Sequence, residues 1–177
     1  MKLRLTCTGA ILLGCIVAGS AAAVDGVSFE GGQGDSATMG RIGLQWNHGK
    51  QWLKGNQWHL GGYWDLAVGH WRRDALPSQN SNLSEIGITP VLRLQPNDGR
   101  GFYGEAGIGV HLLSKTQLGG KRFGTSFQFG NHIGVGYRFG EKSALDLGLR
   151  YQHLSNAGIK QPNNGINFTQ VRLQYWF

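Results

Sequence analysis

A histidine and a serine lie two positions apart near the C-terminal end of the sequence, at His153 and Ser155. If they belong to a β-strand, both side chains project from the same face, about 6.6 Å apart along the strand. An imidazole can lean across that gap, and a base beside a hydroxyl is the minimal activated nucleophile. The pair therefore predicts nucleophilic attack on an ester, unless it merely marks the end of an apolar face.

The other residue types that could do chemistry have less favourable spacing. No two histidines follow a metal-binding pattern such as H-x-x-x-H. Structural roles are therefore expected for His48, His59, His70, His111 and His132. We expect neither a metal site nor a cofactor.

Residues 1–23 have the pattern of an export signal. Lys2 and Arg4 give it a positive start, residues 5–17 are mostly apolar, and a run of alanines ends it. A signal peptide is therefore predicted over residues 1–23. The mature domain would comprise residues 24–177.

Both cysteines, Cys7 and Cys15, fall within this predicted signal segment. The mature protein would then have no disulfide, no thiol nucleophile and no thiolate metal ligand. The stretch Leu12-Leu13-Gly14-Cys15 is somewhat similar to a lipoprotein box. Leu13 fits such a box poorly and the apolar run continues past the cysteine, so we favour the signal peptide.

The rest of the sequence alternates between polar and apolar residues with a period of two. Its 30 glycines, 11% aromatic residues and only 15% charged residues suit strands better than helices. Near the C-terminus, apolar residues at 171, 173 and 175 alternate with polar ones at 170, 172 and 174. The same period predicts further strands around residues 145–151, 127–139, 102–112, 86–94, 60–68 and 42–46, with a weaker strand within 25–33. Eight strands are therefore expected.

One face of nearly every predicted strand is apolar, and the other carries charges of both signs. The charged set is Arg41, Asp65, Glu85, Arg93, Glu105, Arg138, Asp146, Arg150 and Arg172. A soluble lipocalin-like barrel would have the reverse arrangement. Charges paired inside a narrow barrel, with the apolar face toward lipid, fit the pattern better. We therefore predict an all-β fold, an eight-stranded antiparallel transmembrane β-barrel of the bacterial outer membrane. The apolar face suits a homodimer contact as well as lipid, and both stay open.

The lengths of the connections predict the orientation. Counting back from a periplasmic Phe177, short turns alternate with longer loops, which is the outer-membrane pattern. The short turns are 95–101 and 139–143, and the long loops are 71–84, 113–124 and 156–166. The link 48–57 is long for the periplasmic side.

The long loops carry an excess of positive charge. Their only acid is Asp74, against the cations Arg72, Arg73, Lys115, Lys121, Arg122 and Lys160. Such loops would be drawn to phosphorylated lipopolysaccharide, although ordinary solvated charges explain them equally well. The formal charge of +7 becomes +5 without Lys2 and Arg4. No block of Lys and Arg indicates a nucleic-acid partner.

The segment Tyr151–Gly165, with the sequence YQHLSNAGIKQPNNG, resembles the signature of the PagL family of outer-membrane lipid A 3-O-deacylases. The resemblance extends to the strand pattern, the chain length and the C-terminal Phe. It implies that lipid A is the substrate and that the ester-linked 3-hydroxyacyl chain at position 3 is hydrolysed.

Carried over to this sequence, the resemblance implies that Ser155 is the nucleophile and His153 its general base. Asn156 follows the serine as in the family. Its amide and the backbone N–H groups of Ala157 and Gly158 are candidates for the oxyanion hole.

The sequence departs from the family at the third catalytic position. The family has a Glu about a dozen residues after the serine, whereas this chain has Asn167 there. An amide can orient the imidazole but cannot neutralise it. Alternatives for the third residue are Asn163, Asn164 or an acid on a neighbouring strand, such as Glu105. The sequence also leaves open a non-enzymatic barrel that binds lipopolysaccharide or host surfaces, and an acyltransferase or phospholipase.

Overall fold

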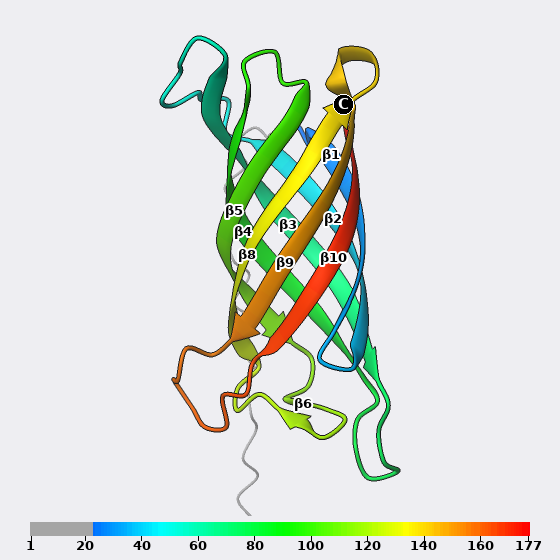
Figure 1. Cartoon of the computed structure of the whole chain (residues 1–177). Coiled ribbons are helices and arrows are strands. Elements are labelled where there is room, and N and C mark those ends of the chain that lie inside the picture. The colour runs from blue at the N-terminus through cyan, green and yellow to red at the C-terminus, as the bar shows by residue number, and fades with distance from the viewer. Residues whose placement is uncertain (1–22) are drawn as a thin grey trace, which may run out of the picture.

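The computed structural model describes residues 23–177, so the predicted signal segment lies almost wholly outside the described residues. These residues form one closed antiparallel barrel (Figure 1). Its strands are β1 (Gly26–Gly34), β2 (Ala37–Asn47), β3 (Trp58–Arg73), β4 (Asn82–Pro96), β5 (Gly101–Leu113), β8 (Phe127–Phe139), β9 (Leu145–Ser155) and β10 (Ile166–Trp176). The predicted fold class is confirmed, including the weaker first strand.

Closure joins the two ends of the sheet. The order around the barrel is β1-β10-β9-β8-β5-β4-β3-β2. The ladder between β1 and β10 runs from Gly26↔Trp176 to Gln33↔Thr169. Every strand therefore has a partner on both sides, as a sheet surrounded by lipid requires. None of the described residues forms a helix long and apolar enough to cross a membrane.

Burial alternates along the strands with the predicted parity. In β9, Leu147 and Leu149 are 50% and 49% exposed, whereas Asp146 and Arg150, which flank them along the strand, are buried. The apolar side chains thus cover the outer wall of the barrel and the polar ones fill its interior. This is the opposite of a soluble barrel and fits a lipid environment.

The long loops gather at one end of the barrel (Figure 1). The predicted loop 71–84 is shorter than expected, because β3 and β4 stay paired as far as Arg72↔Asn82. The loop after β5 contains a small hairpin of β6 (Gln117–Leu118) and β7 (Lys121–Arg122). The opposite end has the C-terminus, the link 48–57 and a short 3₁₀ turn, Glu141–Ser143.

Apolar side chains close the interior at the end with the long loops. Trp71, Leu118, Phe123, Leu154 and Phe168 are all less than 2% exposed and belong to one buried cluster. The cluster joins the strand ends to the β6–β7 loop. The ends of β9 and β10 that flank the loop after Ser155 therefore belong to the same apolar cluster as residues of the β6–β7 loop.

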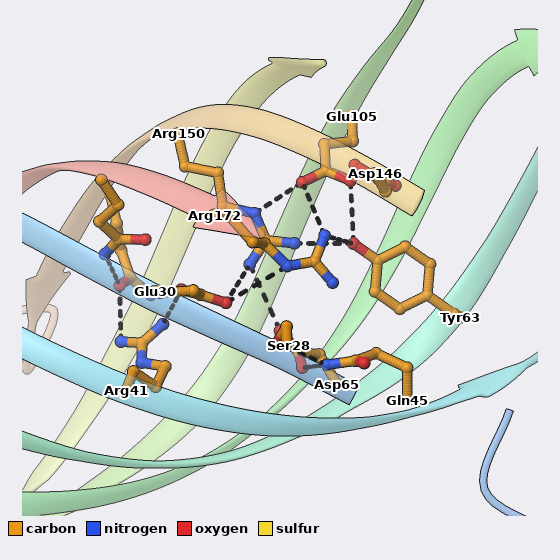
Figure 2. A network of polar contacts seen from close by, with 12 residues as sticks. Ser28, Glu30, Arg41, Gln45, Tyr63, Asp65, Glu105, Asp146, Arg150 and Arg172 are labelled. Atoms are coloured by element: carbon orange, nitrogen blue, oxygen red, sulfur yellow. Dashed lines mark hydrogen bonds and ion pairs between the residues drawn. The ribbon is translucent and has the colours of Figure 1, made fainter. Parts of the chain in front are cut away.

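Farther from the long loops than this cluster, the interior contains a network of ion pairs (Figure 2). Arg150 bonds Glu105 at 2.6 Å, Glu30 at 3.2 Å and the Tyr63 hydroxyl at 2.7 Å. Arg93 likewise bonds Glu105 at 2.8 Å and Asp146 at 2.7 Å. The expected pairing of interior charges is confirmed for these groups.

Arg138 is an exception among the predicted interior charges. It is half-buried and donates to the backbone oxygen of Ser143 at 3.1 and 2.9 Å. No ion pair to a carboxylate is formed by Arg138 within residues 23–177. Its guanidinium lies 5.0 Å from the ring centre of Trp176, near the end that carries the C-terminus.

Glu105→Gln should destabilise the barrel, because Arg93 and Arg150 would both lose a charged partner inside it. We expect the free energy of unfolding to fall by about 3–5 kcal/mol. Urea unfolding in detergent micelles, followed by the electrophoretic shift between folded and unfolded barrel, measures this. Glu141→Gln in the exposed turn is the matched control. Equal unfolding midpoints for both variants would show that the network does not stabilise the fold.

Candidate active site

His153 and Ser155 lie at the end of β9, on the alternating face that also carries exposed Leu149 and Tyr151. Both residues are half-buried. Across the sheet, Asn167 on β10 and Asn131 on β8 are the register partners of His153. The polar pair therefore adjoins apolar outer wall on one side and the long loops on the other.

Asn167 is the residue that the structure brings to the imidazole. Its Oδ1 lies 2.8 Å from Nδ1 of His153. An amide oxygen only accepts, so this contact puts a proton on Nδ1 and leaves a lone pair on Nε2. That tautomer is the one a general base toward Ser155 requires.

The position of Gly165 shows where the edge of the His153 imidazole lies. Gly165 is one residue beyond the last pair of the β9–β10 ladder, Ile166↔Leu154, which places it beside Ser155. A Cβ at Gly165 would be 2.7 Å from Cε1 of His153 and 3.3 Å from Nε2. The ring therefore leans toward the serine end of the strand.

No hydrogen bond joins His153 to Ser155 within the described part of the chain. Catalytic hydrogen bonds are often long before substrate binds and shorten in the complex. The arrangement has an imidazole, an acceptor at its Nδ1 and a hydroxyl on one patch of the wall.

Asn156 holds the loop that follows Ser155. Its carboxamide donates to the backbone oxygens of Phe123 at 2.8 Å and Lys160 at 2.7 Å, and its Oδ1 accepts the N–H of Gly158 at 3.0 Å. Its own N–H donates to Oδ1 of Asn163 at 2.9 Å. The carboxamide of Asn156 is thus fully engaged in loop structure.

These contacts narrow the oxyanion-hole candidates. The N–H groups of Asn156 and Gly158 both have partners. That of Ala157 has none within residues 23–177, and Ala157 has a left-handed φ of 53°. Of the predicted donors, the Ala157 N–H is the one available to a ligand.

The alternatives for the third catalytic position do not reach His153. Asn163 bonds the backbone of Asn156, and the exposed Asn164 makes no hydrogen bond to the imidazole in the described structure. Glu105 lies in the interior, where Arg93 and Arg150 bind its carboxylate. Glu105 therefore does not supply the acid for this site.

Asp35, in the turn between β1 and β2, is a site residue that the sequence did not reveal. Its Oδ2 accepts the backbone N–H of Asn167 at 3.0 Å and lies 2.9 Å from Nζ of Lys121. Burial raises the pKa of Asp35, but the bonds from Lys121 and Asn167 outweigh it and lower the pKa below its ordinary value. Asp35 is therefore an anion at neutral pH.

A hydrogen bond between another histidine and serine lies on the far side of the barrel. Nδ1 of His70 on β3 is 3.2 Å from Oγ of Ser84 on β4, and both residues are exposed. Spacing along the sequence could not reveal it, because the contact crosses two strands. No group of three or more His, Cys, Asp or Glu is placed to hold a metal ion among the described residues.

Comparison with known proteins places the chain in a family. The family model of lipid A 3-O-deacylase (PagL) matches residues 38–176. Lipid A deacylase PagL of Bordetella bronchiseptica is 34% identical over 171 residues, covering 94% of this chain and 92% of that protein. The protein of the same name from Pseudomonas aeruginosa is 33% identical over 148 residues, or 83% of each chain.

A solved structure agrees with this assignment, and a second one shares the fold. A crystal structure of the outer membrane enzyme PagL superposes with a TM-score of 0.77 and 31% identity, covering 86% of this chain and 99% of that one. Neisserial surface protein A has a TM-score of 0.54 at 14% identity and covers 86% of this chain and 94% of its own, so it shares the fold alone. With a family model that spans most of the barrel and relatives identical at a third of their positions, the chain belongs to the PagL family of lipid A 3-O-deacylases.

Proposed function

We propose that the protein is a serine esterase of the outer membrane that hydrolyses the ester-linked 3-hydroxyacyl chain at the 3-position of lipid A. Family membership supports the reaction and the substrate. The observation that carries the assignment to particular residues is the 2.8 Å contact between His153 Nδ1 and Asn167, beside Ser155. It leaves Nε2 of His153 as a base on the serine side.

In the first half of the reaction, Oγ of Ser155 attacks the ester carbonyl and its proton passes to Nε2 of His153. The carbonyl oxygen becomes an oxyanion, which the free N–H of Ala157 can bind. One such donor is typically worth about 3 kcal/mol in the transition state. The C–O bond to the sugar then breaks, and His153 returns the proton to the departing sugar hydroxyl.

The second half releases the acyl chain. Water attacks the acyl-enzyme while His153 again takes a proton, and the proton returns to Oγ as the Ser155 ester bond breaks. The products are a free 3-hydroxy fatty acid and lipid A with one chain fewer. Every proton moves between named groups, so the scheme requires no cofactor.

The site suits a substrate that stays in the membrane. His153 and Ser155 share their strand face with the exposed Leu149 and Tyr151, so an acyl chain lying along the wall brings its ester to the serine. On this proposal the site faces the outer leaflet. An acyltransferase with its acceptor site inside the barrel is not favoured, because charged side chains occupy that space.

Basic residues beside the site are available for the phosphates of lipid A. Three of these cations already have partners within the protein: Lys121 and Arg73 bond Asp35, and Lys115 bonds Asn82. Arg122 and Lys160 are exposed, and the Asn156 carboxamide fixes the backbone at Lys160 and next to Arg122. On this proposal, Arg122 and Lys160 orient the headgroup.

Ser155→Ala should abolish deacylation, with a loss of at least about a thousandfold, because the nucleophile is removed. Mass spectrometry of lipid A from cells that express each variant measures this as retention of the 3-hydroxyacyl chain. Ser84→Ala is the matched control, since Ser84 is likewise a serine near a strand end on the outer wall and is hydrogen-bonded to a histidine, His70.

The two serine variants separate the hypotheses. Activity in Ser84→Ala but not in Ser155→Ala supports the proposal. The reverse pattern would move the site to β3 and β4. Lipid A that stays unchanged even with the folded wild-type protein would favour a non-enzymatic barrel.

Gly165→Ala should reduce kcat/KM by roughly a hundredfold, because its methyl group would displace the imidazole from the serine. Gly49→Ala is the control for backbone strain. Its φ of 66° resembles the 57° of Gly165, but a Cβ there meets nothing within 4 Å. Deacylation rates on purified lipid A in micelles compare the variants. Equal rates for Gly165→Ala and wild type would mean that the ring position does not matter.

A further inference from the structure

We propose that Asp35 is a positioning residue of the active site, which holds Asn167 so that its side-chain oxygen faces His153. The inference rests on the proposed function. It gives the chain a fixed hydrogen-bond acceptor for the imidazole at the place where the family's glutamate is absent.

Barrel closure brings Asp35 to this place. The β1–β10 ladder ends at Gln33↔Thr169, and the same register continued by two residues sets Asp35 opposite Asn167. The approach is close at Gly34, where a Cβ would collide with the backbone oxygen of Asn167. His153, Asn167 and Asp35 therefore form a row across neighbouring strands.

The contacts within this row assign the amide orientation. Oδ2 of Asp35 accepts the backbone N–H of Asn167 at 3.0 Å and its side-chain Nδ2 at 3.4 Å. Because Nδ2 faces Asp35, Oδ1 faces Nδ1 of His153. The three side chains thus have one consistent direction of hydrogen bonding.

An asparagine alone does not fix this direction. Its oxygen accepts and its nitrogen donates, and the two ends have nearly the same shape. The flipped amide would donate to Nδ1 of His153 and move the ring proton to Nε2, where the base is needed. A carboxylate only accepts, so Asp35 favours the productive orientation and disfavours the flipped one.

The residues around Asp35 keep its side chain in the carboxylate form, which can only accept hydrogen bonds. Lys121 from β7 lies 2.9 Å from its carboxylate, and Arg73 from β3 bonds its backbone oxygen at 2.7 Å. The side chain is 31% exposed, so solvent reaches it only in part. The register partners of His153 on both sides, Asn131 and Asn167, are uncharged.

A purely structural role would give a different result from the positioning role. Asp35 also ties the β1–β2 turn to Lys121, and Lys121 bonds the backbone oxygen of Gly165. If that tie were its only function, loss of Asp35 would loosen the loops and raise KM. A wrong tautomer instead lowers kcat and leaves KM unchanged, since substrate still binds.

The test compares Asp35→Asn with wild type for kcat, KM and pH profile on purified lipid A in micelles. We expect kcat to fall roughly tenfold or more, because the base is wrongly protonated in most molecules. We also expect the midpoint of the acidic limb of kcat/KM to move to lower pH, because a negative charge near His153 is removed and Lys121 is left unpaired. Asp35→Glu should restore part of kcat. Asp74→Asn, another loop acid at the same end, should behave as wild type.

Repeating the Asp35→Asn substitution in an Asn167→Glu variant makes the test specific for the orientation of the Asn167 amide. In Asn167→Glu, a carboxylate would contact His153 directly, and adding Asp35→Asn should then cost less than about twofold. Unchanged kcat and pH profile in Asp35→Asn, while Ser155→Ala is inactive, would overturn the role of Asp35 and leave the esterase intact. An equal loss from Asp35→Asn in both backgrounds would also overturn it. Activity in Ser155→Ala would instead reject the proposed function itself.

Discussion

The structure depends on mutual neutralisation of charges inside a narrow barrel. Among the described residues, four buried arginines, at 41, 93, 150 and 172, share the interior with five buried carboxylates, at 30, 65, 85, 105 and 146. An isolated charge there would be strongly unfavourable, whereas charges held at hydrogen-bond distance compensate each other. Tyr63 links the arginines, since its hydroxyl contacts three of them. Because the interior arginines and carboxylates pair with one another, the outer wall is free to be apolar.

That division of the barrel determines where chemistry can occur. Polar groups on the outer face are rare, and they lie where the strands end and the loops begin. His153 and Ser155 are in this zone, and barrel closure brings a residue of the first turn to the same row. The candidate site is therefore assembled by long-range register, although the proposed nucleophile and base are two residues apart in the sequence.

Much of this could be predicted from the sequence. Alternation gave the strands and the face of each residue, because a period of two is imposed by backbone geometry. The pair His153 and Ser155 followed from the same parity. The predicted loop 71–84 was too long, because its ends lack strong alternation although the ladder of β3 and β4 extends through them.

Other features could not be predicted, because they depend on contacts between distant segments. Asp35 is 132 positions from Asn167, and only the β1–β10 register joins them. The engagement of Asn156 with Phe123 and Lys160 depends on how two loops pack. The pair His70 and Ser84 crosses neighbouring strands and has no signature along the chain.

The filled interior also bears on permeability. Arg93, Arg150 and Arg172 are each no more than 2% exposed, and bulky apolar side chains cover them at one end. Eight strands leave little room beyond such side chains. The cylinder formed by residues 23–177 therefore offers ions and nutrients no open path, so inserting many copies would not in itself make a membrane permeable.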